Sequence, residues 1–568
     1  MRGTVQRSGY VLALLAMASP VWAQSALPGG VDPAQIERQF KPPEQPLSGG
    51  DGVRPPQRPP VEMPEGAEAA TFVLRGFEIE GATVFDPRDF VSEYERLIGT
   101  EVSVRTLYEV AAAITARYVA AGYVLSQAVV PPQQIGKDGI ARLRVVEGYV
   151  DRTIIRGGAH GRDGLLRAYG ERIRAERPLT LKTLERYLLL ASDLPGASVS
   201  GTLTPSATVP GAADLIFEID HKPVDAHAAL DNRGSRYVGP WQGIAGVNLN
   251  SPMGLNERTG LLYAFSPFQW EKLKYGRVSH EETLNEEGTR LGLDAGLISA
   301  HPGHTLKDLA VRSRSTSLGL TLGHALIRSR AENLGLQGRL EARDTATFQY
   351  GDSLIAKDAL RTVRLGGRYD WIDAWAWAPA VTLVTVEASQ GLDVLGARRT
   401  GSDGLSVAGG RSDFFKVTAE ATRTQRLDED FSLLAGLTGQ WAASTLLSAE
   451  QFSLGGGQYG RGYDPAEIAG DHGIGAKLEL RCAGPEIPAV DSWQIYGFWD
   501  GGRVWPADPH GAGQAHDIAS AGLGLRAALA DRAGLTLELA KPLTHPLAVA
   551  SGDGGKGPRG FLSLTVRY

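Results

Sequence analysis

The chain has 568 residues, a formal net charge of −6 and one cysteine, Cys482. A single cysteine excludes an intramolecular disulfide and a cysteine-rich metal cluster, and the net negative charge gives no indication of a nucleic-acid partner. The mean hydropathy is −0.15, and no run of about 18 apolar residues occurs, so transmembrane helices are not expected.

The first 23 residues have the pattern of a secretory signal peptide. Arg2 and Arg7 precede an apolar stretch over 10–18 that is too short to span a bilayer, and Val21 and Ala23 offer small residues before a cleavage site. We expect residues 1–23 to be removed and the mature chain to leave the cytoplasm. Such a protein either stays soluble or crosses a membrane as a β-barrel.

A stretch rich in Pro, Gly and Gln follows over residues 24–70 and predicts an extended, semi-rigid linker. The segment 32–40 interrupts this composition. Asp32 can cap a short helix and Pro33 can open it. A short disordered patch is the alternative, and the sequence leaves both open.

Residues 71–150 and 151–224 each predict a small α+β unit, because strand-like alternation and helical spacing follow one another in both. The first unit is expected to contain a strand over 72–80, a helix that Ser103 caps and Gly122 ends, and strands over 123–130 and 140–147. The second is expected to contain a strand at 153–155, a helix around 165–173, a helix that Thr180 caps, and strands over 199–203 and 213–220.

From residue 225 onward, short alternating runs separated by turn residues replace the helical signal. The last such run, 561–568, places Leu562, Leu564 and Val566 on one face together with the terminal aromatic Tyr568. A soluble β-sandwich also alternates, but the runs are too many for one sandwich. The 344 residues of 225–568, at roughly 20 per strand and connection, give about 17 strands, and an even-numbered barrel makes this 16.

The predicted fold is therefore multi-domain, with two small α+β domains before a C-terminal 16-stranded transmembrane antiparallel β-barrel. Only alternate residues of a barrel strand meet lipid, which reconciles a membrane location with the polar composition. A barrel of this size encloses an aqueous channel.

Two clusters interrupt the alternation and are the candidate functional residues. The first is the glycine-rich loop 455–465, which carries Arg461 and can fold inward. The second lies on the strand that begins near Trp493, where parity turns Phe498, Asp500 and Gly502 to the lumen. A carboxylate inside a barrel favours a cation, so Arg461 is expected to pair with Asp500, and Glu479 could share the arginine. The alternative is an exposed loop arginine and a solvated carboxylate on the pore wall.

These motifs resemble those of the TpsB-type transporters of two-partner secretion, the haemolysin and filamentous-haemagglutinin secretion family. That family has a plug helix with a linker, two periplasmic POTRA domains and a 16-stranded barrel. One residue departs from its pattern, since Gly460 stands where the family usually has valine. The matching positions are 118–126, 130–133 and 143–148 in the first α+β unit, Arg461, Gly462 and Tyr463 in the loop, and Phe498, Asp500 and Gly502 in the strand.

The resemblance implies an outer-membrane transporter with POTRA domains at 71–150 and 151–224 in the periplasm and a barrel at 225–568. Its partners would be outer-membrane lipid and one large secreted exoprotein, captured by the POTRA domains and exported in extended form. No nucleic acid, cofactor, metal or catalytic residue is expected. Candidate passenger-binding residues are Tyr123, Pro131, Pro132 and Gln133, although Tyr123 could equally be a core residue.

Three other functions remain as alternatives. An insertase of the same superfamily would share the loop motifs but usually carries more POTRA domains. A diffusion porin has no reason to carry periplasmic binding modules. A soluble periplasmic enzyme would need a nucleophile or metal constellation, and the sequence offers no convincing one.

Overall fold

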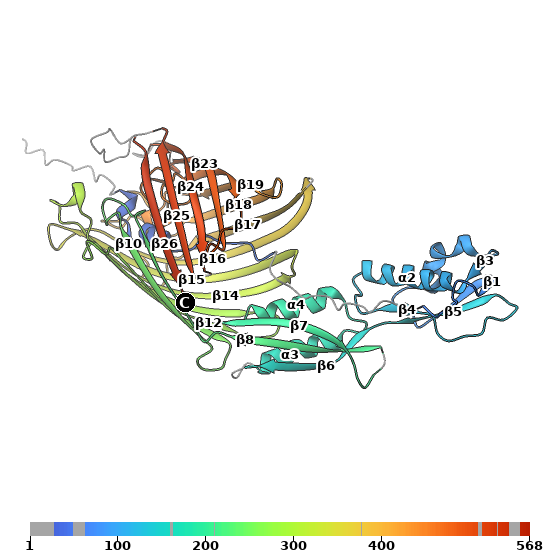
Figure 1. Cartoon of the computed structure of the whole chain (residues 1–568). Coiled ribbons are helices and arrows are strands. Elements are labelled where there is room, and N and C mark those ends of the chain that lie inside the picture. The colour runs from blue at the N-terminus through green and yellow to red at the C-terminus, as the bar shows by residue number, and fades with distance from the viewer. Residues whose placement is uncertain are drawn as a thin grey trace, which may run out of the picture.

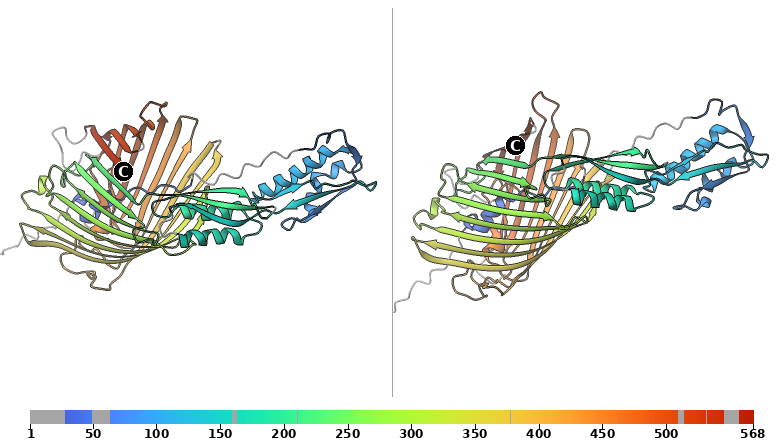
Figure 2. Two further views of the ribbon diagram at one scale, coloured as in Figure 1. Left: turned by 60° about the horizontal axis from the view of Figure 1, so that its bottom comes forward. Right: turned by 90° about the horizontal axis from the view of Figure 1, so that it is seen from below.

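The computed structural model describes residues 28–48, 63–158, 163–209, 211–376, 378–508, 514–530, 532–544 and 557–568. The expected signal peptide lies outside these ranges. A barrel forms one part of the molecule, and an elongated arm of two α+β units projects from one of its ends (Figures 1 and 2). None of the described helices is long and apolar enough to cross a membrane.

The segment 32–40 forms a helix. After a short 3₁₀ turn, η1 (Gly29–Val31), Asp32 caps α1 (Pro33–Gln39), because its carboxylate accepts hydrogen bonds from the amides of Ala34 at 2.8 Å and Gln35 at 3.2 Å. The proline occupies the first helical turn, where its missing N–H costs nothing. Of the two possibilities that the sequence leaves open, the structure therefore shows the helix.

The first α+β unit packs α2 against a three-stranded sheet of order β2-β5-β4, in which β2 and β5 are parallel. Its apolar core includes Ile114, Tyr118 and Leu143. The elements are β1 (Thr71–Val73), β2 (Gly76–Glu80), η2 (Pro87–Glu93), η3 (Glu95–Leu97), β3 (Glu101–Ser103), α2 (Val104–Ala120), β4 (Gln127–Val129) and β5 (Ile140–Val146).

Two expectations for this unit are wrong in detail. The strand expected over 72–80 is two strands, because the chain changes partners after Leu74: β1 pairs with β3, whereas β2 pairs with β5. The strand expected over 123–130 begins only at Gln127. Residues 122–126 turn instead, since Tyr123 N–H bonds back to Tyr118 O at 2.9 Å and Gly122 takes a φ of +92°.

The second α+β unit repeats the plan, with sheet order β6-β8-β7 and β6 parallel to β8. Thr180 caps α4 through a hydrogen bond that its hydroxyl accepts from Thr183 N–H at 3.3 Å. The elements are β6 (Tyr149–Gly157), α3 (Asp163–Ala175), α4 (Leu181–Ser192), β7 (Ala197–Pro205) and β8 (Ala212–His221).

Sixteen antiparallel strands of the described chain close into a barrel when β26 pairs with β9, which confirms the predicted fold class. One short 3₁₀ helix, η4 (His304–Leu306), lies in a loop. The strands are β9 (Val224–Asp231), β10 (Gln242–Asn250), β11 (Glu257–Phe265), β12 (Leu273–Thr283), β13 (Arg290–Ala300), β14 (Arg312–Arg328), β15 (Glu332–Gln349), β16 (Ser353–Ala376), β17 (Ala378–Gly391), β18 (Phe415–Arg426), β19 (Phe431–Ala442), β22 (His472–Ala483), β23 (Ser492–Trp505), β24 (His516–Leu529), β25 (Ala533–Pro542) and β26 (Arg559–Arg567).

The arm defines the two ends of the barrel. Only Lys222 and Pro223 separate β8 from β9, so the arm joins where β9 begins, which we call the arm end. Ion pairs tie α4 to the turns at this end: Arg186 lies 3.1 Å from Glu287, and Arg328 lies 2.8 Å from Asp193. The opposite end, where β9 finishes, is called the far end.

Candidate functional site

The chain between β19 and β22, residues 443–471, forms a loop that folds into the barrel, and we call it the inner loop. It contains η5 (Ser448–Glu450) and two short strands, β20 (Phe452–Leu454) and β21 (Ile468–Gly470), which pair antiparallel. Leu454, Tyr459 and Tyr463 pack with Val504 of β23 and Ile518 of β24. The inward fold expected for the glycine-rich segment is therefore present.

Arg461 and Asp500 are in direct contact at the centre of this loop. Arg461 Nε lies 2.6 Å from Asp500 Oδ2, and the backbone amides of Gly460 and Arg461 donate to Asp500 Oδ1 at 2.9 and 3.0 Å. The Asp500 side chain is fully buried, with 0% exposed. A buried carboxylate is stable only when it is paired and hydrogen-bonded, and here the loop supplies its charge partner and two of its donors.

Glu479 shares the arginine, as the sequence allowed, and a third carboxylate joins it. Arg461 Nη1 lies 2.8 Å from Glu479 Oε2 and 3.4 Å from Glu538 Oε2. The Arg461 guanidinium also stacks on Phe498, with its carbon 3.5 Å from the ring centroid. Three acidic groups and one aromatic face surround this cation, and we call the set the Arg461 cluster.

The two glycines of the motif are required by close approach. A Cβ on Gly462 would lie 2.9 Å from Pro542 N of the wall, and a Cβ on Gly502 of the wall would lie 2.7 Å from Leu454 Cδ1 of the inner loop. Either side chain would push the inner loop away from the wall. Tyr463 is buried, and its hydroxyl lies 3.1 Å from Thr544 Oγ1.

Gly460, the departure from the family pattern, is explained locally. Its φ is +80°, a conformation that valine adopts only under strain, and a Cβ there would lie 2.5 Å from Ile518 Cδ1. The tight backbone at this residue directs two amides at Asp500. The glycine therefore fits the loop, and Ile518 occupies the space that a side chain would need.

Sequence reasoning missed Glu538 and its neighbours. Tyr496 OH donates to Glu538 at 2.9 Å and Arg233 lies 2.7 Å from it, while Arg526 lies 2.6 Å from Glu479. The sequence did contain a signal. Glu538 alternates with Leu537 and Leu539 of β25, and this alternation places its carboxylate on the lumen face. Only the closed barrel shows that this carboxylate reaches the same arginine.

A second buried ion cluster anchors the start of the inner loop and was also missed. Glu450 is 2% exposed and lies 2.7 Å from both Arg364 of β16 and Lys416 of β18. Arg364 also forms an ion pair with Glu341 of β15, at 3.3 Å. The loop is thus held to two separate parts of the wall, to β16 and β18 through Glu450 and to β22, β23 and β25 through Arg461.

The helix α1 lies in the lumen against the inner loop. Gln35 Nε2 donates to Ser448 O at 3.0 Å and Gln451 O at 3.1 Å, while its Oε1 accepts from Ser453 OH at 2.8 Å. On the other side of the helix, Glu37 lies 2.7 Å from Arg343 of β15. The helix therefore bridges the loop and the barrel wall.

The four candidate passenger-binding residues lie on the connections around β4. Tyr123 packs edge-on against the core residue Tyr118, with ring centroids 6.1 Å apart. Pro132 is exposed and Pro131 is half-buried. The Gln133 side chain accepts from Arg142 N–H at 2.7 Å and donates to Arg142 O at 2.8 Å, so it continues the β4–β5 ladder. Within the described residues, no group of three or more His, Cys, Asp or Glu is arranged to hold a metal ion.

Comparison with known families gives two matches. Residues 298–527 match the family of the haemolysin secretion/activation protein ShlB/FhaC/HecB, and residues 72–148 match the ShlB-type POTRA domain. The heme/hemopexin transporter protein HuxB of Haemophilus influenzae (strain 86-028NP) is 22% identical over 454 residues, 79% of each chain. The outer membrane transporter CdiB-2 of Burkholderia pseudomallei (strain 1026b) is 24% identical, over 79% of this chain and 75% of that one.

Solved structures share the fold. CdiB from Escherichia coli superposes with a TM-score of 0.69 at 18% identity, over 92% of this chain and 94% of that chain. BamA from Haemophilus ducreyi lacking POTRA domains 1–3 gives a TM-score of 0.50 at 14% identity, over 88% and 100% of the two chains.

Proposed function

Because the chain is a two-partner secretion transporter of the ShlB/FhaC/HecB type, with a ShlB-type POTRA domain, we propose that it exports one large partner protein through its barrel in extended form. The observation that carries this proposal is the occupied lumen. A helix and an inner loop, both held by specific polar contacts, lie where the passenger would pass. Such contents suit a channel that opens for one substrate rather than a permanently open porin.

Capture of the passenger begins at the arm. In the sheets of order β2-β5-β4 and β6-β8-β7, the edge strands are β2, β4, β6 and β7. An extended peptide can add to such an edge as a further strand. Pro131 and Pro132 lie on the connection next to β4, where they could contact a peptide at this edge. Tyr123 and Gln133 support the same region from within the unit, so their effect on capture would be indirect.

The Arg461 cluster would hold the inner loop in the position that export needs. Arg461→Ala leaves Asp500, Glu479 and Glu538 without their shared cation, and breaking a buried pair in this way costs about 3–5 kcal/mol. Asp500→Ala removes the acceptor of two loop amides. We expect either substitution to abolish export while the barrel still inserts.

The test measures the partner protein in the medium of cells that carry each variant, with heat-modifiable gel mobility as the check on barrel insertion. Arg339→Ala is the matched control, since Arg339 of β15 faces the lumen between outward-facing neighbours such as Leu340, pairs with Asp294 at 2.6 Å and lies outside the Arg461 cluster. Export close to the wild-type level in both Arg461→Ala and Asp500→Ala would refute the role of the cluster.

The insertase alternative makes a different prediction. A chain that assembles other barrels would, on depletion, lower the amounts of unrelated outer-membrane proteins. A dedicated exporter would leave them unchanged and lose only its partner. Two α+β units in the described arm favour the exporter.

A further inference from the structure

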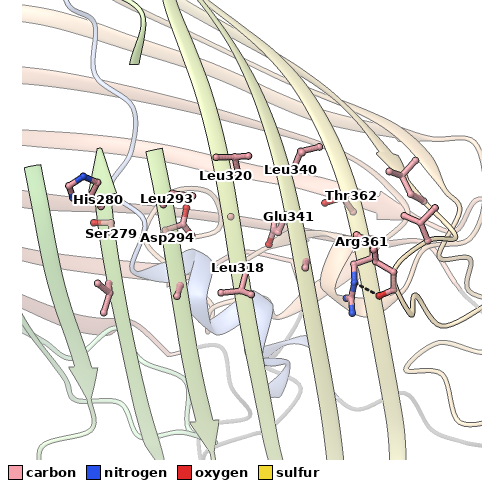
Figure 3. Close-up of a pocket in the computed structure, with 17 residues that line it drawn as sticks. Ser279, His280, Leu293, Asp294, Leu318, Leu320, Leu340, Glu341, Arg361 and Thr362 are labelled. Carbon is pink, nitrogen blue, oxygen red and sulfur yellow. Dashed lines mark hydrogen bonds between the residues drawn. The ribbon is translucent and has the colours of Figure 1, made fainter. Parts of the chain in front are cut away.

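An apolar groove of about 630 Å³ lies on the outer face of the barrel, across β12–β16 (Figure 3). Leucines from three neighbouring strands form its floor: Leu293 of β13, Leu318 and Leu320 of β14, and Leu340 of β15. Leu318 is 56% exposed, which places this floor on the lipid-facing side of the wall. The volume falls in the range of about 300–1,000 Å³ that is typical of sites for small ligands.

One wall of the groove is a loop that folds against the barrel. After β17, Leu392 N–H donates to Arg361 O at 2.8 Å, and Arg361 Nε donates back to Leu395 O at 3.1 Å. Arg361 Nη1 also donates to Asp344 Oδ1 at 2.8 Å. These bonds hold Val394 beside the groove and leave Leu395 85% exposed at its rim. The groove is therefore a built feature rather than a flat stretch of wall.

Two further cations stand above the groove, toward the far end. Strand register places Arg314 of β14 opposite Ala346, and Ala346 opposite Lys357 of β16. Each cation lies four residues, or about 13 Å, farther along its strand than the groove residues Leu318 and Arg361 and on the same outer face. Both side chains are exposed, and neither makes a hydrogen bond or ion pair with another described residue.

The position along the barrel identifies the membrane leaflet. The POTRA arm is periplasmic and joins at the arm end, so the far end faces outward. The exposed leucines of β14 and β15 continue from the groove toward the arm end, through Leu322, Leu326 and Leu336, so the groove lies on the outward side of this apolar belt and opens into the outer leaflet. Basic side chains at a membrane surface attract anionic lipid headgroups, and arginine and lysine bind phosphate in particular. A lipid that fits carries a phosphate headgroup above an acyl chain that can enter the groove.

We propose that this face binds a phosphorylated outer-leaflet glycolipid of the lipid A class. An acyl chain occupies the leucine-lined groove beside the 392–395 loop. The phosphate lies between Arg314 and Lys357. The nearby carboxylates Asp344 and Asp393 are paired with Arg361 at 2.8 Å and Arg399 at 3.2 Å, and so do not repel the headgroup.

The experiment counts lipid A molecules bound to the purified full-length protein by native mass spectrometry in detergent. The variant Arg314→Gln with Lys357→Gln is compared with Arg503→Gln with Lys541→Gln, which removes two exposed cations at the far end of β23 and β25, on the other side of the barrel. We expect a roughly thirtyfold weaker apparent affinity in the first double variant and no change in the second. Equal binding by the first double variant and the wild type would overturn the proposal.

Two further experiments measure the contributions of the phosphates and of the acyl chains to binding. Lipid A from which both phosphates have been removed should bind the wild type about as weakly as diphosphorylated lipid A binds the first double variant. Ala342→Phe, which fills the groove with an apolar side chain and leaves the cations in place, should also weaken binding of the acylated lipid. Phosphatidylglycerol that binds as tightly as lipid A would refute the assignment to lipid A.

Discussion

Gln35 offers the most direct test of how α1 is kept in the lumen. Its side chain is 3% exposed and makes three hydrogen bonds to the inner loop, two to backbone carbonyls and one from Ser453. A neutral hydrogen bond contributes about 1 kcal/mol to the free energy of docking, and the loss is larger when the buried partner is left without a hydrogen bond. Gln35→Ala should therefore weaken the docking of α1 by about 2–3 kcal/mol. That shifts the equilibrium between docked and released helix roughly 30- to 150-fold.

A second glutamine of α1, Gln39, provides the control substitution. Gln39 lies one turn further along α1, and neither its Oε1 nor its Nε2 has a hydrogen-bond partner in the described structure. Gln39→Ala removes the same atoms from the same helix with no bond to lose. We expect it to leave docking unchanged or slightly strengthened, because an unsatisfied amide is a cost to the docked state.

Planar-bilayer recording of the purified full-length protein measures the outcome as the fraction of time spent in the open state at a fixed low voltage. Gln35→Ala should raise this fraction strongly, by the factor above where the wild type is mostly closed, whereas Gln39→Ala should follow the wild type. Equal open fractions in the two variants would refute the reasoning, because the hydrogen bonds would then not determine the position of the helix.

Two further predictions concern the inner loop and the arm. Gly460→Val, which restores the residue usual in the family, should reduce export, because a β-branched residue at a φ of +80° is strained by more than about 1–2 kcal/mol and its Cβ meets Ile518. Ile518→Ala should recover export only in part, and wild-type export by Gly460→Val alone would contradict this. In the first α+β unit, burial raises the pKa of Glu147, but hydrogen bonds from the Thr83 hydroxyl, two backbone amides and Tyr118 OH outweigh it, so the pKa is lowered. Its stabilisation is present above the unfolded pKa and is lost as pH falls through the folded value. Glu147→Gln should cost about 1 kcal/mol at pH 7, for a partly exposed carboxylate, and the difference from wild type in thermal unfolding should vanish in acid; a difference that persists there would count against it.

The sequence predicted those features that depend on local periodicity. Alternation along β23 assigns Phe498 and Asp500 to the lumen, and in the structure both are buried while Trp499 between them is exposed. A side-chain period of two is a property of the strand itself, so it needs no knowledge of the neighbours. The number of strands was predicted from chain length and from the requirement that such barrels close with an even number of strands.

Partners that come from distant strands could not be predicted. Glu538 lies 77 residues from Arg461 and reaches it only because β25 and β23 flank β24 in the closed sheet. Alternation shows which face a residue occupies but not its register against other strands. Glu450 was missed for a second reason. It lies in an irregular loop, where no period exists to place a side chain.

The contacts of the inner loop imply an order of events for opening. All the hydrogen bonds that Gln35 makes to the loop go to residues 448–453, near Glu450, whereas the Arg461 cluster joins the other part of the loop to β22, β23 and β25. Neutral hydrogen bonds at about 1 kcal/mol each break far more readily than a buried ion cluster at about 3–5 kcal/mol. The helix is also held by the Glu37–Arg343 ion pair and by Arg38, which donates to Gln451 O at 2.9 Å, so these contacts must break before it leaves the lumen. None of them involves the Arg461 cluster, so Arg461 can still hold the loop to the wall. In that state the glycine-rich segment would line the passage that the helix has vacated, which is where an exported chain would meet it.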